Sequence, residues 1–371
     1  MDIFGLINYD LANILRRIFR IITAVVIPLL VTFLLIFAFK TAEVTATTTK
    51  VGMIFDSDTF DDMGFKWLSY QGLLRAEDQL GVIGAVYTST DFSEIEPNVQ
   101  QCAIDGNDLC IGVGWMLTDA ISNTAAVYNS TLFALLDNSI ETDLSNVRGI
   151  LFASEDAGYL AGTLAGLMSH SNVIGDLGGM EIPPVTAFTE AYRNGAQCAN
   201  ENITTIISYT NDFNYPELGA QYAQGMIAQG ADVVFAAAGL TGSGAILTAT
   251  QSGVWAIGVD TDQYYSVFLS GTITGSNYLL TSAMKRLDNA VFYTISDVVS
   301  GTFSSGIIIY DLAAGGVGLA PFHETEEAIH NDVRIMLDMV KMAILDGRID
   351  PLDPDGLCLL RYQQYLPFTL R

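Results

Sequence analysis

Basic residues are scarce in this chain, which has 16 Lys and Arg against 41 Asp and Glu and a formal net charge of −25. Proteins that bind a nucleic-acid backbone do so through clustered Lys and Arg side chains. The charge balance therefore argues against a DNA or RNA partner. Excess acid mainly supports solubility and says little about the fold.

Residues that bind metals are also few. The chain has three histidines and four cysteines: His170, His323, His330, Cys102, Cys110, Cys198 and Cys358. The cysteines have no paired spacing of the metal-binding type, so we expect no metal site and no cofactor. Cys102 and Cys110 could form a disulfide in an oxidising compartment, although sequence separation alone does not distinguish a disulfide from two thiols. The acidic turn 350–356 contains prolines and lacks a downstream glutamate, which favours a solvated turn over a calcium site.

One long apolar run stands near the N-terminus, where residues 21–39 carry no charge. Its length is about what a bilayer core requires. Arginines cluster before it and Lys40 follows, which predicts cytoplasmic residues 1–20 and an exported remainder. A cleaved signal peptide usually has a shorter apolar region and a small-residue cleavage site, and neither is clear here, so we favour an uncleaved anchor over a signal. Residues 40–49 are then typical of a linker that holds an extracytoplasmic domain at the cell membrane.

From residue 50 onward, segments with the patterns of strands and helices alternate. The predicted strands are 51–55, 82–88, 111–113, 132–136, 149–152, 173–177, 203–209, 232–237 and 254–259. The predicted helices are 62–79, 156–168, 185–199, 216–229, 281–299 and 324–345. Such alternation predicts parallel sheets with both faces covered by helices. Because one open sheet of about ten strands is unusual, and because 371 residues leave room for two domains, we predict two smaller doubly wound α/β lobes.

The segment 258–263, Gly-Val-Asp-Thr-Asp-Gln, places two carboxylates and a carboxamide where the predicted strand 254–259 ends. In open α/β sheets, ligands bind in the crevice beyond the carboxyl ends of the strands. Lys285 follows one segment later, in a chain with few lysines. These residues predict a site for a polar small molecule. The Gly-rich stretch 239–244 lacks the Gly-Lys-Ser/Thr ending of a phosphate loop, which argues against nucleotide hydrolysis.

A series of motifs keeps its order and spacing across residues 50–350. The motifs lie at 56–65, 111–115, 152–162, 178–183, 230–242, 257–263, 285–288 and 315–319. Together they resemble the basic membrane protein family, the purine-nucleoside receptors that serve ABC transporters as substrate-binding proteins. The resemblance implies a type I periplasmic-binding-protein fold, in which two Rossmann-like lobes joined by a hinge trap a ligand between them.

On this basis we expect a two-lobed domain at 50–350, with a C-terminal tail at 351–371. Lobe 1 is expected at 50–148 plus 262–300, and lobe 2 at 149–261 plus 301–350. The implied function is capture of a nucleoside outside the cytoplasm and its delivery to ABC permease subunits for import. No acid/base pair, nucleophile motif or metal cluster stands out, so we expect no enzymatic turnover. The alternative is a sensory or regulatory binding protein of the same fold.

The resemblance also implies roles for individual residues. Phe65 and Phe213 match the two phenylalanines that sandwich the base, and aromatic rings stack well on a flat base. Asp56 matches the base-reading carboxylate, and Asp260 matches the aspartate that accepts hydrogen bonds from the ribose. Lys285 matches a lysine that donates to ligand oxygens or to a ring nitrogen. Packing of the phenylalanines in a core, and solvation of the strand-end carboxylates, are the alternatives.

The remaining candidates for ligand binding carry weaker signals. Gly239 and Gly242 would let backbone amides approach a ligand closely. Asp137 stands at the end of a predicted strand, Asp62 lies in the Asp-rich first loop, and Trp115 ends the second motif.

Two positions depart from the family pattern. The family's Asn after the loop phenylalanine is Lys66 here, and the usual Asp before Pro is Tyr215. An amide both donates and accepts hydrogen bonds, whereas an ammonium group only donates. The base specificity is therefore open, and the ligand is a purine nucleoside, an unusual nucleoside or another flat molecule such as riboflavin.

Overall fold

The structure is a computed structural model that describes residues 15–20, 22–26, 48–58, 63–140, 143–356 and 358. The chain divides into two units, Met1–Thr48 and Thr49–Arg371. In the first unit, residues 15–20 are helical and η1 (Ile22–Val26) is a π-helical turn. Most of the predicted membrane segment 21–39 lies outside the described residues. Within the described ranges, no helix combines the length and the apolar character needed to cross a membrane.

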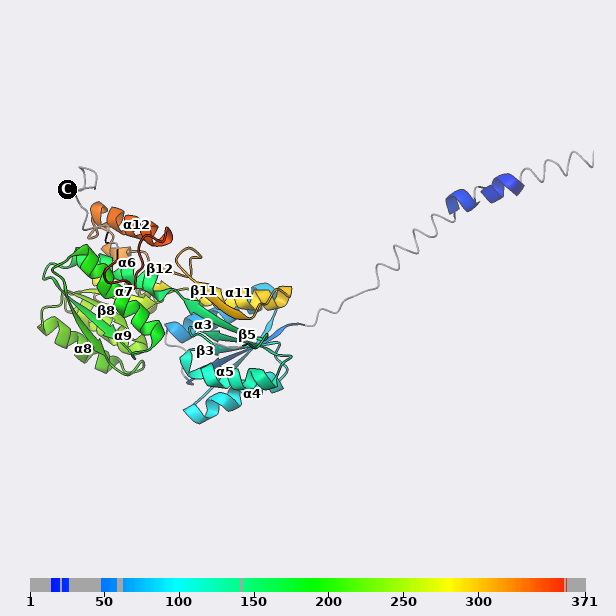
Figure 1. Cartoon of the computed structure of the whole chain (residues 1–371), viewed down its shortest axis with the longest axis horizontal. Coiled ribbons are helices and arrows are strands. Elements are labelled where there is room, and N and C mark those ends of the chain that lie inside the picture. The colour runs from blue at the N-terminus through cyan, green and yellow to red at the C-terminus, as the bar shows by residue number, and fades with distance from the viewer. Residues whose placement is uncertain are drawn as a thin grey trace, which may run out of the picture. The chain divides into compact units, whose positions relative to one another are not determined.

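In its described residues, the second unit is built on two six-stranded sheets (Figure 1). The first sheet has the strand order β11-β5-β4-β3-β1-β2, and its neighbours are all parallel. Its strands are β1 (Lys50–Phe55), β2 (Ile83–Thr88), β3 (Leu109–Val113), β4 (Leu132–Leu136), β5 (Val147–Phe152) and β11 (Gly306–Tyr310). The helical segments of this lobe, called lobe 1, are α3 (Phe65–Leu80), η2 (Phe92–Glu94), α4 (Ile95–Ile104), η3 (Trp115–Leu117), α5 (Thr118–Val127) and α11 (Leu287–Ser300).

The second sheet has the order β12-β10-β9-β8-β6-β7, and β12 alone runs antiparallel to its neighbour. Its strands are β6 (Val173–Gly178), β7 (Thr204–Tyr209), β8 (Val233–Ala237), β9 (Trp255–Asp260), β10 (Leu279–Lys285) and β12 (Val317–Leu319). The helical segments of this lobe, called lobe 2, are α6 (Ser154–Met168), α7 (Pro183–Ala199), α8 (Pro216–Ala228), α9 (Gly239–Gln251), α10 (Gln263–Ser266), η4 (Ser276–Tyr278), η5 (His323–Thr325) and α12 (Asn331–Leu345). Two α/β lobes with parallel sheets are as predicted.

The chain crosses between the lobes at 152–154, 285–287 and 310–317. The predicted boundaries at 149, 262 and 301 need correction. β5 pairs with β4 and β11 through residue 152, so residues 149–152 belong to lobe 1, and so does β11. β10 pairs with β9, so residues 262–285 belong to lobe 2. The prediction of a single helix over 281–299 is wrong, because β10 (Leu279–Lys285) and α11 (Leu287–Ser300) follow each other with only Arg286 between them. No glycine or proline marks the boundary between strand and helix in this segment.

The helices α6 and α7 pack backbone against backbone in lobe 2. Glycines recur every fourth residue along α6, and the backbone of α7 lies directly against them. A Cβ at Gly162 would overlap the carbonyl oxygen of Tyr192, and one at Gly158 would collide with the backbone of Phe188. These positions therefore require glycine, because the space that a side chain would need is filled by backbone.

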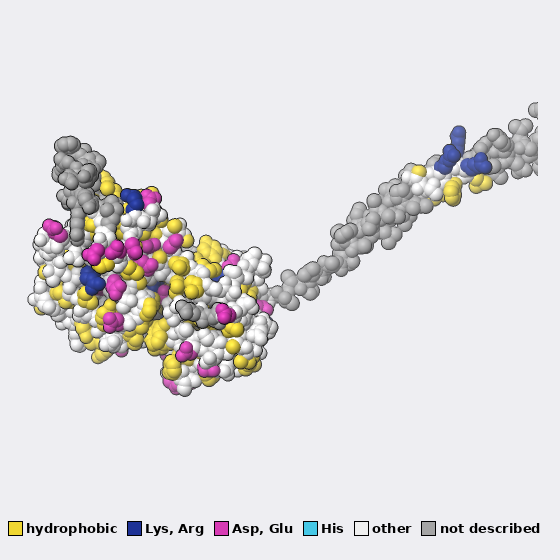
Figure 2. Space-filling view, in the orientation of Figure 1, with side chains coloured by type: hydrophobic (Ala, Val, Ile, Leu, Met, Phe, Trp, Pro, Cys, Tyr) yellow, Lys and Arg dark blue, Asp and Glu magenta, His cyan; other side chains and the backbone are white. Residues whose placement is uncertain are grey.

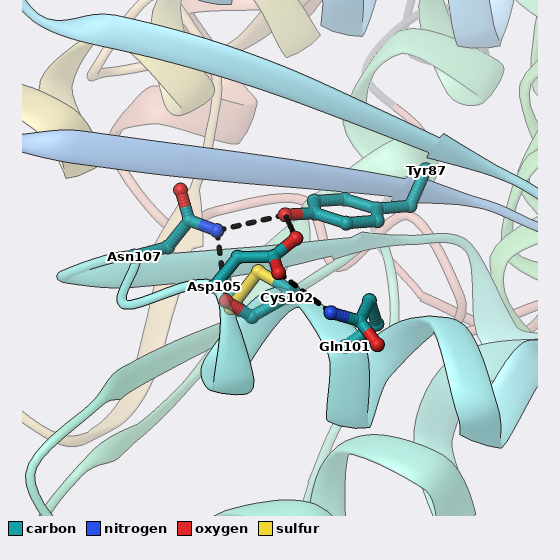
Figure 3. Close-up of a disulfide and its surroundings, with 6 residues drawn as sticks. Tyr87, Gln101, Cys102, Asp105 and Asn107 are labelled. Atoms are coloured by element: carbon teal, nitrogen blue, oxygen red, sulfur yellow. Dashed lines mark hydrogen bonds between the residues drawn. A yellow bond between two sulfur atoms is a disulfide. The ribbon is translucent and has the colours of Figure 1, made fainter.

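Two disulfides fasten the second unit. Cys102 of α4 is joined to Cys110 of β3, which settles the alternative left open by the sequence, and both residues are fully buried. Figure 3 shows the polar groups around this bridge: Asn107 donates to Tyr87 and to the carbonyl of Cys102, and Tyr87 in turn donates to Asp105. The second bridge joins Cys198 of α7 to Cys358, and so ties the segment after α12 to lobe 2.

Candidate ligand-binding cavity

A cavity of about 320 Å³ lies where the carboxyl ends of the two sheets meet. Such edges of parallel sheets are where α/β proteins bind ligands. Its lining includes residues that end or follow strands of both sheets: Asp56, Gly114, Trp115, Asp137, Gly239, Asp260 and Lys285. The volume is at the lower end of the range for small-molecule pockets.

Aromatic rings reach the cavity from both lobes. Phe65 begins α3 in lobe 1, and Phe213 lies in the loop after β7 in lobe 2. The ring of Phe213 lies against Gly179, where any Cβ would collide with the ring. The backbone carbonyl oxygen of Phe213 accepts a hydrogen bond of 3.2 Å from the Thr241 amide. Glycine at position 179 and the start of α9 therefore fix the position of this ring.

Two aspartates at strand ends have left-handed backbone conformations. Asp137 follows β4 with φ 61°, and Asp260 ends β9 with φ 63°. Non-glycine residues are uncommon in this region of φ, although aspartate tolerates it better than most. Such strain clusters at functional sites, and both residues line the cavity.

A buried ion pair joins the lobes at the cavity. Nζ of Lys285 donates to both oxygens of Asp137, at 3.0 and 2.8 Å, and only 3% of Lys285 and 6% of Asp137 are exposed. Burial raises the pKa of the Asp137 carboxyl, and the neighbouring Lys285 ammonium opposes this rise without cancelling it. Lys285 was predicted to donate to a ligand, and the structure shows it donating to Asp137.

A second ion pair lines the lobe 1 wall of the cavity. Nζ of Lys66 lies 2.6 Å from Oδ1 of Asp56 and donates to Oγ of Ser57 at 2.7 Å. All three residues line the cavity beside Phe65. The residue that departs from the family pattern thus neutralises the carboxylate predicted to read the base.

The acidic surface bears on the charge of a ligand. On the face shown in Figure 2, acidic side chains far outnumber basic ones. The two cavity lysines already face carboxylates. A net charge of −25 repels anions, so the cavity suits a neutral ligand better than a phosphorylated one.

The structure brings most of the predicted site residues together. Eight of the ten line the cavity: Asp56, Phe65, Trp115, Asp137, Phe213, Gly239, Asp260 and Lys285. Gly242 does not line it, since it lies inside α9 against Ala236 and Ala238. Asp62 lies outside the described residues. Whether the eight bind a ligand stays a prediction.

Sequence reasoning missed several lining residues. Phe188 lies in α7, and Asn211, Asp212 and Asn214 flank Phe213 in its loop. The polar loop around Phe213 could have been found from its neighbours in sequence. Phe188 could not, because it belongs to the periodic apolar face of α7 and has the pattern of a core residue.

The crossing segments carry an acidic cluster outside the cavity. Asp156, in the first turn of α6, accepts a hydrogen bond of 3.3 Å from the amide of Leu312 on the third crossing. Burial raises the pKa of Asp156 to about 6, and the nearby carboxylates of Glu155 and Asp311 add to the rise. This carboxyl therefore connects two of the segments on which the lobes would pivot.

Two α/β lobes, three crossing segments and a polar, aromatic cavity between the sheets define the two-lobed periplasmic-binding-protein fold. The chain belongs to the family described as ABC transporter substrate-binding protein PnrA-like, which it matches over residues 49–346. This confirms the resemblance drawn from the sequence motifs.

Known relatives cover most of the chain. It is 32% identical over 317 residues to the CD4+ T-cell-stimulating antigen of Listeria monocytogenes, covering 81% of this chain and 87% of that protein. It is 30% identical to the ABC transporter nucleoside-binding protein BmpA of Lactococcus lactis, covering 82% and 89%. Among solved structures, an ABC transporter solute-binding protein from Aeropyrum pernix superposes with a TM-score of 0.73 at 25% identity, covering 81% and 92%.

Proposed function

We propose that this protein captures a nucleoside in the cavity between its lobes and delivers it to an ABC permease for import. The observation that carries the proposal is the pair of rings, Phe65 and Phe213, that reach one cavity from opposite lobes beside the carboxylate of Asp260. A flat base would lie between the rings, and ribose hydroxyls would donate to Asp260. The name of the Lactococcus relative supports this ligand class.

The proposed mechanism is binding without turnover. The lobes would close about the three crossing segments, and closure would bury the ligand and signal occupancy to the permease. A purine base suits the two-ring sandwich, because its larger face fills more of the space between the phenylalanines. The ligand would leave the protein chemically unchanged.

We place the binding domain outside the cytoplasm. The uncharged run 21–39, with arginines before it, would anchor the chain in the membrane. The two disulfides in the second unit support this placement, since such bridges persist in oxidising compartments.

Ligand binding can be tested directly with the full-length protein in detergent. Isothermal titration with inosine and guanosine should show saturable binding, and chromatography should recover the nucleoside intact. Phe65→Ala and Asp260→Asn should each weaken binding by about tenfold or more, as expected for the loss of a stacked ring or of a charge-assisted hydrogen bond.

Two variants serve as matched controls. Phe92 is 74% exposed and lies outside the cavity, and Asp338 is exposed on α12. Phe92→Ala and Asp338→Asn remove the same groups elsewhere and should leave binding unchanged. Full retention of both nucleosides by the Phe65 and Asp260 variants would place the binding site elsewhere, and release of free base would mean that the protein is an enzyme.

A further inference from the structure

The lobe 1 wall of the cavity contains a residue that can decide which base is bound. We propose that Lys66 makes the cavity prefer a ring with a lactam edge, a carbonyl beside a ring N–H, over a ring that carries an amino group at that edge. The inference rests on the proposed function, since it concerns the base-reading wall of the same cavity.

The geometry fixes the Lys66 ammonium in place. Its Nζ is held 2.6 Å from Oδ1 of Asp56 and 2.7 Å from Oγ of Ser57, and its side chain is only 15% exposed. Asp56 and Ser57 directly follow β1, and Lys66 follows Phe65 at the start of α3. The ammonium is therefore part of an ordered wall, next to one of the rings that would hold the base.

Helix stability does not explain a lysine at this position. Lys66 is the second residue of α3, where the positive end of the helix dipole disfavours a cation. No acidic residue occupies the first turn of α3. The negative charge that compensates Lys66 belongs to Asp56, which lies in the same wall of the cavity. A residue that disfavours the start of its own helix, and that lies beside a cavity, is typical of a functional position.

The hydrogen-bonding capacity of this wall differs from that of the family pattern. An asparagine amide both donates and accepts, and rotation of the amide exchanges the two roles. Asparagine can therefore face either a carbonyl or an amino group on a base. Lys66 donates only, and ionised Asp56 accepts only, so the wall presents a fixed donor beside a fixed acceptor.

A lactam edge matches this arrangement. Its carbonyl oxygen accepts from Lys66, and its ring N–H donates to Asp56, which gives two charge-assisted hydrogen bonds. An aminopurine held in the same orientation turns its amino group toward Lys66 and its ring nitrogen toward Asp56. Donor then faces donor and acceptor faces acceptor, so the hydrogen bonds that a lactam makes are lost.

Inosine and adenosine test the inference, because they differ only at this edge. In titrations of the full-length protein, inosine should bind at least about tenfold more tightly than adenosine, the difference expected for one charge-assisted hydrogen bond. Lys66→Asn and Lys66→Gln should bring the two affinities within about twofold of each other. Lys66→Arg keeps a charged donor and should keep the preference. Lys341→Asn, on the exposed face of α12, removes the same charge elsewhere and should leave both affinities unchanged.

The outcomes separate this inference from the proposed function. Failure of the wild-type protein to bind either nucleoside would overturn the proposed function, and the inference with it. Equal binding of inosine and adenosine by the wild type would overturn the inference alone. So would a variant, shown to be folded by circular dichroism, that lacks the lysine and still prefers inosine as strongly. Two different substitutions at position 66 guard against the misfolding of one.

Discussion

Replacing Lys285 with methionine would leave the Asp137 carboxylate buried without its partner. In the wild type the pair makes two hydrogen bonds, at 2.8 and 3.0 Å, and both side chains are more than nine-tenths buried. Breaking a buried pair by removing one partner typically costs about 3–5 kcal/mol, because the remaining charge has lost its compensation. We expect Lys285→Met to lower the free energy of unfolding by this amount at about pH 8.

The same variant should be less destabilised in acid. Burial already raises the pKa of Asp137 above its ordinary value of 3.8, and the loss of Lys285 removes the group that opposes the rise. A carboxyl whose pKa is raised in the folded state supports stability while it is protonated. That support is complete below 3.8 and is lost as pH rises through the folded-state pKa. The cost of Lys285→Met should therefore shrink as pH falls.

Urea denaturation at about pH 5 and about pH 8 measures both effects. The double variant Asp137→Asn/Lys285→Met removes both charges, and it should be more stable at the higher pH than Lys285→Met alone. Equal destabilisation of Lys285→Met at the two pH values, or a double variant no more stable than the single one, would refute this account of the ion pair.

Two further predictions concern packing and pH. Gly162→Ala should lower the free energy of unfolding by about 3 kcal/mol or more, because its Cβ would overlap the Tyr192 carbonyl. Gly225→Ala, in open space on α8, should instead raise it by about 0.5–1 kcal/mol. Urea denaturation of both variants measures the two effects, and equal effects would contradict the packing argument. The raised pKa of Asp156, about 6 against an ordinary 3.8, means that this group's stabilisation is lost as pH rises between those values. Asp156→Asn should remove about 1–2 kcal/mol of that dependence, allowing for partial solvent exposure, and an unchanged pH profile would show that Asp156 is not responsible.

The alternation of strand and helix patterns along the sequence is enough to predict most of the fold. The predicted strand 132–136 coincides with β4, and the predicted helix 216–229 differs from α8 by one residue. The prediction failed near the last two crossings. β10 is joined to α11 by Arg286 alone, without a glycine or proline between them, and the edge strand β11 exposes most of its residues, so neither has the pattern of an isolated buried strand. A bridge such as Cys198–Cys358, across 160 residues, depends on packing that no local pattern records.

Some of the cavity residues could be predicted from the sequence and others could not. Asp56, Asp137 and Asp260 could be found because they follow buried strands, where the carboxyl ends of parallel sheets gather polar groups. The pairing of Lys285 with Asp137 could not, since it depends on how two lobes meet rather than on either segment alone. The pairing of Lys66 with Asp56 could not be predicted either, although the departure of Lys66 from the family pattern marked the position.

The strained aspartates show how one strand-end geometry supports two roles. In the two sheet orders, β4 and β9 hold the same place, each fourth from the edge strand β2 or β7. Asp137 directly follows β4 and Asp260 ends β9, with nearly equal φ. Glycines at positive φ, Gly114 and Gly239, stand within two residues of the ends of the neighbouring strands β3 and β8. In lobe 1 this position holds the lysine that joins the lobes. In lobe 2 we propose that it holds ligand hydroxyls. Because the backbone fixes both carboxylates before any ligand arrives, binding would not have to supply the free energy of positioning them.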